Sequence, residues 1–464
     1  MKRSAIICLS HGAYVRNVVY SELFTHLMER YKLVLLFPVG VTVPVADIPL
    51  LRGVPAITAS IETHRFEKIF LFLRKNVFAG RERTQTFNLI SEAEKQRHPL
   101  AYRVAALANA VLGRLPAVGR WWQRIEARCI PGREFDGLMA EHRPAFVITA
   151  NYGTEALEVR LLRASHRAGV PTLAVVPSWD NLSSKGVIGE NPRQLAVWNE
   201  IMRDEAKSLY GFDQAVVHVV GGLQFDPYGK PLAAERRDEV YQRLGIDPTQ
   251  PFVVIGTITP RYFANNIDIV DILEAGVRDG QLPSNLQVVV RLHPQVIGDP
   301  QYGDDLTQYH LRTQRSPFIK LSVPRVLSWG SIRPPVQADT TELTVLLRDA
   351  VAAVMPATTL AIDACALGCP VIGIGFDGHQ RKPYEQSVRR TFDFTHYRRI
   401  VAEGGLRIAQ SPEQLLAEVR AYLADRSRDA DGRQRIIASH LGQVDGLAWR
   451  RVADIVDTMV APKR

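Results

Sequence analysis

The fold of this chain follows from Val351-Ala-Ala-Val-Met-Pro-Ala-Thr-Thr-Leu-Ala-Ile-Asp-Ala-Cys-Ala-Leu-Gly-Cys-Pro-Val-Ile-Gly373. Residues 351–355 form an unbroken apolar run, which is typical of a strand buried on both faces. Pro356 ends this run, and Gly368 followed by Pro370 marks the end of a short helix. The apolar residues 371–374 predict the next buried strand. A strand, a turn, a helix and another strand indicate an α/β sheet.

The start of the predicted helix has the composition of an anion-binding site. Thr358 or Thr359 can cap the helix and leave its first N–H groups pointing outward. Unpaired N–H groups and the helix dipole both favour negative charge. Asp363 lies four residues after Thr359, about one helical turn or roughly 6 Å along the same face. This spacing suits a phosphate followed by a ribose hydroxyl. An ordinary strand–helix–strand unit with a surface aspartate is the alternative.

The same stretch resembles the donor half of GT-B glycosyltransferases and of CDP-glycerol glycerophosphotransferase-like proteins. In these families a small hydroxylated turn precedes an acidic residue and then Ala-x-Gly-x-Pro, as in residues 358–370 here. The resemblance implies that Thr358 and Thr359 contact the donor phosphates and that Asp363 lies near the ribose. It also places Met355, at the end of the preceding strand, in the nucleotide site. Many GT-B proteins have Glu where this chain has the shorter Asp363.

Length, charge and cysteine usage narrow the class of protein. A chain of 464 residues is expected to form two domains, and its net charge of +9 indicates a polyanionic partner. Because no nucleic-acid motif is present, a phosphorylated substrate or an anionic membrane is favoured over nucleic acid. Four scattered cysteines without metal-ligand spacing indicate reduced thiols. The start is too short for a signal peptide, and no apolar run predicts a transmembrane helix. We therefore expect a cytoplasmic protein, with peripheral attachment to the inner face of the membrane as an open alternative.

The first domain is predicted to span residues 1–235 as an acceptor-side Rossmann-like sheet. His11 lies in the turn after its first strand, where open α/β sheets place ligands. In inverting GT-B enzymes a general base commonly lies in the acceptor domain, and His11 is the position that resembles it. A turn histidine bonded to the backbone is the alternative. The predicted strands are residues 5–9, 33–37, 145–150, 171–176, 194–197 and 216–220.

A polar loop follows the fourth of these strands. It reads Pro177-Ser-Trp-Asp-Asn-Leu-Ser-Ser-Lys-Gly186, and its hydrogen-bonding groups with an indole favour a sugar-contact loop. Ser, Asn and Asp can equally cap turns. The loop resembles one typical of bacterial surface-carbohydrate and CDP-glycerol transferase-like proteins. That resemblance makes Asp180 a second candidate for the base or for a partner of the acceptor hydroxyl.

Residues from about 61 to 130 predict several basic amphipathic helices inserted in the first domain. Their aromatic and basic side chains suit a face that lies against an anionic membrane and reaches a lipid-linked acceptor. A helical cover whose charges are merely solvated is the alternative. The basic residues are Arg65, Lys68, Arg74, Lys75, Arg81, Arg83, Lys95, Arg97, Arg103, Arg114, Arg120, Arg124 and Arg128.

The second domain, residues 236–464, is predicted to bind the nucleotide donor. Strands are expected at 252–256 and 287–292, and the second ends in Arg291-Leu-His-Pro294. This pattern resembles the one near the donor phosphates in CDP-glycerol transferase-like and related GT-B proteins. Arg291 and His293, together with Arg261, would then neutralise a leaving diphosphate without a metal. A packed His293 is the alternative. The last helix, about 447–459, is expected to cross back onto the first domain, as in GT-B folds.

These observations predict an α/β protein with two Rossmann-like domains facing a cleft, the GT-B arrangement. The first half of the chain has no Gly-x-Gly-x-x-Gly, which argues against a nicotinamide enzyme, and the chain has no Walker loop, which argues against ATP hydrolysis. The resemblance implies metal-independent transfer of a sugar, or of glycerol phosphate, from a nucleotide-activated donor to the hydroxyl of a carbohydrate or lipid-linked acceptor. This reaction would serve bacterial surface polysaccharide or glycolipid biosynthesis without a further cofactor. A sugar-nucleotide epimerase of the same fold and an inactive carbohydrate-binding scaffold are the alternatives.

Overall fold

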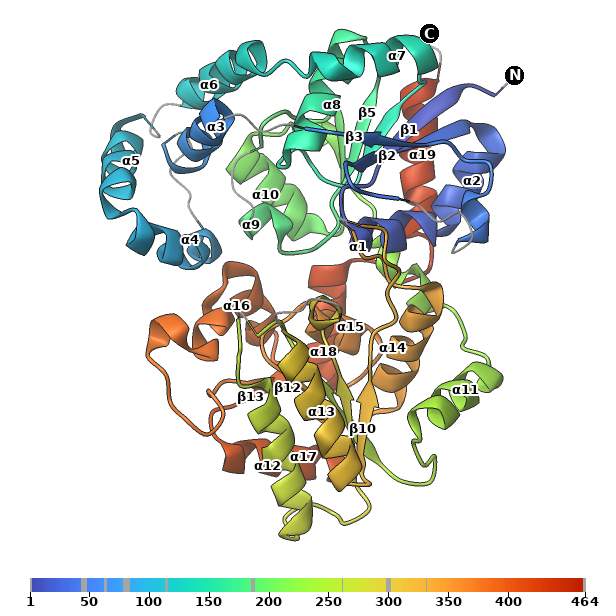
Figure 1. Cartoon of the computed structure of the whole chain (residues 1–464), viewed down its shortest axis with the longest axis vertical. Helices are drawn as coiled ribbons and strands as arrows, with labels where there is room; N and C mark the ends of the chain where they lie inside the picture. Colours follow the sequence, from blue (N-terminus) through green and yellow to red (C-terminus); the bar gives the residue numbers. More distant parts are fainter. Residues whose placement is uncertain are drawn as a thin grey trace. The chain divides into compact units, whose positions relative to one another are not determined.

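The chain folds into two compact units. The computed structural model describes residues 2–42, 48–61, 65–77, 84–112, 116–184, 188–260, 262–297, 302–330 and 332–461 (Figure 1). Unit 1 comprises Met1–Asp226, Leu327–Pro334 and Leu447–Arg464, and unit 2 comprises Pro227–Val326 and Pro335–Gly446. The division places a short internal segment and the C-terminal helix in the same unit as the N-terminal half.

Unit 1 contains a seven-stranded parallel sheet in the order β3-β2-β1-β4-β5-β6-β7. The register is continuous across the centre, where Ile6 of β1 pairs with Val34 of β2 and with Val147 of β4. The order reverses direction between β1 and β4, which is the Rossmann arrangement. The strands are β1 (Ser4–Cys8), β2 (Lys32–Pro38), β3 (Ala56–Ala59), β4 (Val147–Thr149), β5 (Thr172–Val175), β6 (Gln194–Val197) and β7 (Val217–Val219).

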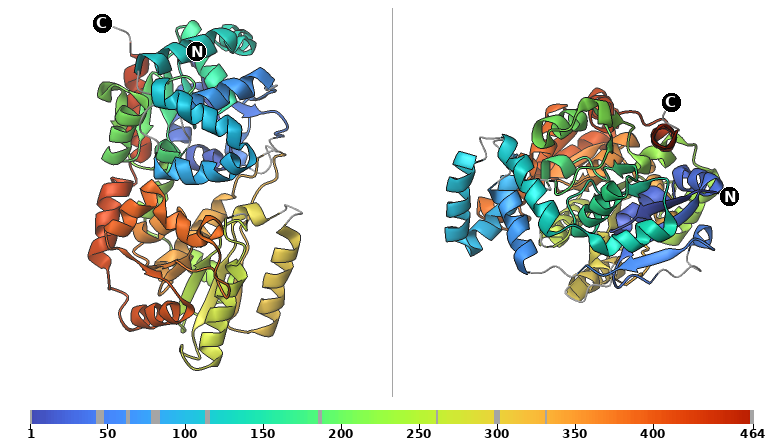
Figure 2. Two further views of the ribbon diagram at one scale, coloured as in Figure 1. Left: turned by 90° about the vertical axis from the view of Figure 1, so that its left-hand side faces the viewer. Right: turned by 90° about the horizontal axis from the view of Figure 1, so that it is seen from above.

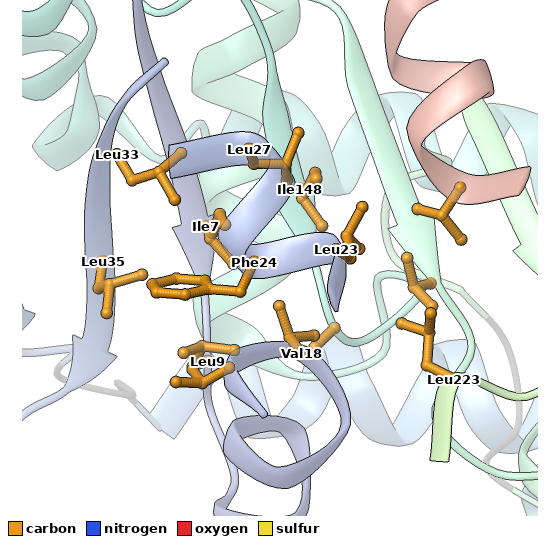
Figure 3. Packing of buried hydrophobic residues seen from close by; sticks show 14 of the residues in the cluster. Ile7, Leu9, Val18, Leu23, Phe24, Leu27, Leu33, Leu35, Ile148 and Leu223 are labelled. Atoms are coloured by element: carbon orange, nitrogen blue, oxygen red, sulfur yellow. The ribbon is translucent and has the colours of Figure 1, made fainter. Parts of the chain in front are cut away.

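Alternate side chains of β1 enter two separate cores, one on each face of the sheet. Ile7 and Leu9 point into the larger core with Phe24 (Figure 3). Ile6 and Cys8 point to the opposite face and pack with residues of α7 and α8. Both faces are buried because parallel strands alternate their side chains between two helical layers. This burial on both sides explains the continuous apolar runs of the central strands.

The helices of unit 1 include a separate group between β3 and β4. Residues 61–130 were predicted to be helical, and α3 to α6 confirm this; Figure 2 shows them gathered to one side of the strands of this unit. Their bounds are α3 (Arg65–Asn76), α4 (Gln85–Arg97), α5 (Pro99–Leu112) and α6 (Pro116–Cys129). The other helices are α1 (Gly12–Tyr14), the π-helix η1 (Val15–Val19), α2 (Glu22–Arg30), α7 (Asp136–His142), α8 (Ala156–Arg167), α9 (Asn181–Ser184), α10 (Glu200–Tyr210) and α19 (Ala448–Val460).

Two distant segments complete the core of unit 1. Trp329 is fully buried there, with its ring edge-on to Phe37 at 6.0 Å between centroids. Helix α19 contacts α2, and its first two amides, on Ala448 and Trp449, each donate to a carboxylate oxygen of Asp226 at 2.9 Å. Asp226 therefore caps α19 and satisfies two of its otherwise unpaired N–H groups.

Unit 2 repeats the strand order of unit 1 in a six-stranded parallel sheet, β10-β9-β8-β11-β12-β13. Its order reverses between β8 and β11. The strands are β8 (Phe252–Gly256), β9 (Gln287–Arg291), β10 (Ile319–Ser322), β11 (Ala353–Met355), β12 (Val371–Ile374) and β13 (Leu406–Ala409). The helices are α11 (Ala234–Leu244), α12 (Asn266–Arg278), α13 (Gly303–Arg315), α14 (Gln337–Asp349), α15 (Leu360–Ala366), α16 (Thr395–Ala402), α17 (Pro412–Ala424) and α18 (Ala430–Ile436), which continues as a π-helix, η10 (Ile437–Leu441).

The stretch that decided the fold behaves largely as the sequence predicts. Strand β11 and strand β12 flank α15, and Gly368 after the helix adopts a φ of +73°. The amide of Cys369 donates to the carbonyl of Ala364 at 2.8 Å, which closes the helix end. The four cysteines form no disulfide. Within the described ranges, no helix has both the length and the apolar character required to cross a bilayer.

Candidate functional site

The reversal of strand order marks the candidate site in each unit. In open parallel sheets, ligands bind beyond the carboxyl ends of the strands at the point where the order reverses. In unit 2 this point lies between β8 and β11, and in unit 1 between β1 and β4. The predicted residues of the stretch 355–359 and of the turn at His11 follow β11 and β1 directly. In each unit, the predicted site residues can therefore be compared with the positions at the carboxyl ends of the strands where the order reverses.

In unit 2, the turn after β11 presents hydroxyl groups at this edge. Thr359 is exposed at the N-cap position of α15 but makes no side-chain capping bond. Thr358 is half-buried, and its Oγ1 lies 3.5 Å from the amide of Leu360. Met355, by contrast, is fully buried in the strand. Two hydroxyls thus remain at the surface of the turn, and the predicted role of Met355 in the nucleotide site stays a prediction.

Gly256 at the end of β8 allows the turn after β11 to lie close to the sheet. A Cβ at this position would approach Leu360 Cδ2 to 2.5 Å and the Cβ of Met355 to 3.5 Å. A larger residue at this position would require the tip of the Leu360 side chain, which lies over the strand end, to shift. The start of α15 is therefore held directly against the end of β8.

His293 follows β9, which neighbours β8 on the side away from β11, and its ring is an uncharged group. Its Nδ1 accepts a hydrogen bond from the amide of Gln295 at 3.2 Å, and its own amide donates to Thr257 Oγ1 at 2.9 Å. Burial lowers the pKa of His293 to about 4. Because Nδ1 is an acceptor, the proton of the neutral ring lies on Nε2. At neutral pH the ring can therefore donate a hydrogen bond from Nε2, and the predicted contact of His293 with the donor phosphates stays a prediction.

Arg291 is also not an available cation. Its Nη2 lies 2.5 Å from Asp339 Oδ2, and its Nη1 lies 3.3 Å from Glu342 Oε1. Nη1 also donates to Ser322 Oγ at 3.0 Å. All four side chains are buried, and Arg243 forms a further ion pair with Glu342. Two carboxylates on α14 thus neutralise the guanidinium, which ties β9 to that helix. Its predicted contact with a phosphate stays a prediction.

Asp363 lies on α15 and faces the N-terminal part of unit 2. It is buried, and its Oδ1 accepts a hydrogen bond from the hydroxyl of Tyr228 at 2.8 Å. The carbonyl of Tyr228 in turn accepts from Arg348 Nη2 at 2.9 Å. One carboxylate oxygen of Asp363 therefore holds the chain near the start of unit 2. Its predicted contact with a ribose stays a prediction, and the predicted Arg261 lies outside the described residues.

In unit 1, the backbone fixes the ring of His11. The residue caps α1, and its Nδ1 accepts from the amide of Ala13 at 3.2 Å. The proton of a neutral ring then lies on Nε2, so in this arrangement the outer nitrogen donates a hydrogen bond. A general base requires an unprotonated nitrogen. His11 would have to break this cap before Nδ1 could act as a base, and its predicted catalytic role stays a prediction.

Gly12, beside His11, is required by a close approach of the backbone. A Cβ there would lie 2.6 Å from the carbonyl oxygen of Arg333, in the short segment that unit 1 takes from the second half of the chain. The turn after β1 is therefore held against residues more than 300 positions away.

Asp180 is engaged within its own loop. Its Oδ2 accepts from Ser184 Oγ at 3.2 Å, and its Oδ1 accepts from the hydroxyl of Ser178. Trp179 is buried, so its indole offers no exposed face to a sugar. This local bonding matches the turn-capping alternative. The predicted role of Asp180 in proton transfer stays a prediction, and residues 185–187 of the loop are outside the described ranges.

A buried acid that the sequence reasoning missed lies beneath the edge of unit 1. Glu158 is in the first turn of α8, and neither carboxyl oxygen has a hydrogen-bond partner of normal geometry among the described residues. Burial raises its pKa to about 7, although the nearby Ser10 hydroxyl acts in the opposite direction. Burial and the charge of Glu158 both raise the pKa values of Cys8 and Tyr14. These groups converge at the end of β1, next to His11.

Helical periodicity was the signal that could have found Glu158. Residues three, four and seven positions further along α8 are Leu161, Leu162 and Ser165, and all are fully buried. Positions at these spacings share one face of a helix. An acid on that face is costly unless it is neutral or paired, and such acids concentrate at functional sites.

Known proteins resemble this chain in three-dimensional structure but not in sequence. No family model and no curated sequence matches the chain. A UDP-GlcNAc 2-epimerase from Neisseria meningitidis, solved with UDP-GlcNAc, has a TM-score of 0.54 at 10% identity and covers 99% of this chain and 100% of its own. A glycosyltransferase from Rickettsia africae has a TM-score of 0.51 at 9% identity, covering 100% of both chains. The wall teichoic acid polymerase TagF has a TM-score of 0.53 at 10% identity, covering 99% of this chain and 89% of its own.

The chain has the GT-B fold. The matches extend over both units, and each unit of this chain has the Rossmann strand order. The α/β fold class predicted from the sequence is therefore confirmed. Identities near 10% establish this likeness of fold alone.

Proposed function

We propose that this protein transfers a glycosyl group, or glycerol phosphate, from a nucleotide-activated donor to an acceptor hydroxyl in the synthesis of a bacterial surface polysaccharide or glycolipid. In this proposal unit 2 binds the donor and unit 1 handles the acceptor. The observation that carries it is the carboxyl end of the sheet in unit 2, where Thr358 and Thr359 present hydroxyls after β11 and the neutral donor His293 follows β9. The solved structures of similar fold include enzymes whose names specify nucleotide-sugar, glycosyl-transfer and teichoic acid chemistry.

The donor phosphates would be held by hydrogen bonds from neutral groups. Hydroxyls and an imidazole N–H can stabilise the charge that develops on a leaving nucleotide when they are fixed in advance. The His293 ring is fixed by its bond from Gln295, and its backbone is fixed by Thr257. A phosphate near this ring would favour the imidazolium and raise the pKa of His293 from its low starting value. The metal independence of the reaction stays a prediction.

Proton removal from the acceptor would fall to unit 1. His11, Asp180 and Glu158 are the titratable groups described above at the carboxyl edge of its sheet. Glu158 is too deeply buried to touch an acceptor, so we assign it a positioning role beneath the turn of His11. The open choice between His11 and Asp180 is decided by which variant loses turnover while it retains donor binding.

Donor binding can be tested by thermal shift with UDP, GDP, CDP and CMP. A nucleotide at 100 times its dissociation constant adds about 2.7 kcal/mol to the free energy of unfolding. We expect one base to give this stabilisation, and the double variant Thr358→Ala/Thr359→Ala to lose most of it. Thr307→Ala, an exposed threonine on α13 of the same unit, is the matched control and should behave as wild type. If the nucleotide stabilises the double variant as much as it stabilises Thr307→Ala, the donor does not bind at Thr358 and Thr359.

The reaction itself can be separated from epimerisation. The protein is incubated with the nucleotide sugar that binds, first alone and then with a lipid-linked or carbohydrate acceptor. If the protein is a transferase, a glycosylated product should form only when the acceptor is present. An isomerised nucleotide sugar without acceptor would identify an epimerase, and the failure of every nucleotide to bind would identify an inactive scaffold.

A further inference from the structure

Helix α5 in the inserted group carries an unpartnered apolar stripe. Leu100, Val104, Leu107 and Val111 are 75%, 66%, 71% and 68% exposed. Their spacing of four, three and four residues places them on one face of the helix. Large aliphatic side chains this exposed, in a continuous row, normally mark a surface that binds something apolar.

The stripe is not the face by which α5 packs into the fold, because the opposite face of the helix makes those contacts. Ala105 is buried, and the ring of Tyr102 lies edge-on to Phe72 of α3 at 5.3 Å between centroids. Figure 1 shows α5 at the outer edge of the inserted helices, away from the strands of unit 1. The helix is thus anchored by one face and presents the other.

Exposed apolar side chains are concentrated in this group of helices. Twelve large hydrophobic residues are exposed in the described part of the chain, and eight of them lie between residues 61 and 130. Besides the stripe they are Phe66, Ile69, Ile90 and Trp121. Exposed tryptophan is enriched in proteins that lie in the membrane interface, and Trp121 of α6 is 57% exposed. Exposed apolar side chains are thus found on α3, α4 and α6 as well as on α5.

The same segment holds most of the net charge of the protein. Residues 61–130 contain thirteen Lys and Arg but six Asp and Glu, so they contribute seven of the nine net positive charges. Some of these cations are neutralised inside the fold, as Arg74 is by Glu126 at 3.0 Å. Arg103 remains exposed on α5 beside Val104 and Leu107. An apolar stripe with an exposed cation beside it, in a segment of net positive charge, complements a bilayer with anionic headgroups.

We propose that α5 lies in the surface of an anionic membrane, with Leu100, Val104, Leu107 and Val111 inserted among the acyl chains. The inference extends the proposed function, since it names the surface on which a lipid-linked acceptor would be met, but it does not depend on which nucleotide is bound. The cations of the segment attract anionic headgroups, and the stripe provides the hydrophobic contact. Neither signal alone gives stable attachment, because one of them supplies attraction without insertion and the other insertion without attraction.

The test is co-sedimentation of the full chain with vesicles of phosphatidylcholine alone and of phosphatidylcholine with phosphatidylglycerol in equal parts. We expect binding to the mixed vesicles, weakened by salt, and little binding to the neutral ones. The variant Val104→Ser/Leu107→Ser should reduce the partition coefficient roughly tenfold or more. Val39→Ser removes an exposed valine of unit 1 outside the stripe and should partition as wild type.

Other outcomes would overturn the proposal. Equal partitioning of the stripe variant and wild type would show that charge alone binds the membrane. Failure to bind mixed vesicles, together with a dimer by light scattering that the stripe variant dissociates, would show that a second copy covers the stripe. The nucleotide thermal shift is measured on the same variants. Since it reports on unit 2, its presence or absence separates failure of the proposed function from failure of membrane binding.

Discussion

The two units have the same strand order but different chemistry at the point where that order reverses. In unit 2 the Thr358 and Thr359 hydroxyls follow β11, the neutral His293 follows β9, and Arg291 at the end of β9 is neutralised by buried carboxylates. In unit 1 the corresponding edge brings together His11 and the buried acid Glu158. The first carries hydroxyls and a neutral imidazole, and the second carries a backbone-bonded histidine above an acid whose pKa burial raises to about 7.

This difference shows that topology gives the place of a site but not its role. Both edges lie where parallel sheets bind ligands. Their functions are set by the side chains that the adjoining turns and helices supply. The proposed transfer requires one of these sites to bind the donor and the other to remove a proton from the acceptor. The following experiments test whether the two edges differ as described.

The largest expected effect concerns the buried ion pairs of unit 2. Arg291→Ala removes the cation paired with Asp339 and leaves Glu342 with Arg243, and we expect it to lower the free energy of unfolding by about 3–5 kcal/mol. Urea denaturation measures this loss. Arg236→Ala, which breaks an exposed pair with Glu239, is the control and should cost less than about 1 kcal/mol. A stable Arg291→Ala protein that no longer binds nucleotide would instead make Arg291 a direct ligand of the donor.

The next effect concerns Glu158 in unit 1. Its pKa rises from 4.5 to about 7 on folding, so folding takes up a proton between these values and stability falls as pH rises through this window. Glu158→Gln removes this dependence. We expect the variant to gain roughly 3 kcal/mol relative to wild type between pH 4.5 and 7. Chemical denaturation across this range measures the gain.

The exposed Glu155 at the start of the same helix provides the matched control. Glu155→Gln should leave the pH dependence of stability as it is in wild type, because this side chain is open to water. Parallel stability profiles for Glu158→Gln and wild type would show that Glu158 is ionised in the folded protein, and the contrast between the two edges would be lost.

The smallest effect is spectroscopic and concerns His293. Burial lowers its pKa to about 4, so the folded state binds this proton more weakly than the unfolded state, whose pKa is near 6.5. Stability from this residue is therefore complete above pH 6.5 and declines as pH falls towards 4. NMR of nitrogen-labelled histidine should show a neutral ring protonated on Nε2 at pH 7. A midpoint near 6.5 without ligand would restore His293 as a ready cation.

Much of the fold could be predicted from the sequence, and the exceptions have one cause. The predicted strands 194–197, 252–256 and 371–374 match β6, β8 and β12, because strands covered on both faces appear as continuous apolar runs. The strands that were not predicted, β3, β10 and β13, all lie at sheet edges. Edge strands are partly exposed and lack such runs, as the burial of β3 illustrates. Their pairing partners, which are distant in sequence, decide that they are strands.

The candidate site, too, was predictable from the sequence only in part. Glycine, proline and hydroxyl spacing in the stretch 351–373 determined the turn that presents Thr358 and Thr359, since these residues act on the local backbone. The state of Arg291 and the burial of Glu158 depended on residues from other elements, such as Asp339, which lies 48 positions from Arg291. A sequence shows which groups are present and where turns bring them to a strand end. Only the tertiary structure decides which of those groups are already paired, neutral or buried, because desolvation and ion pairing arise from contacts between segments that are far apart in the chain.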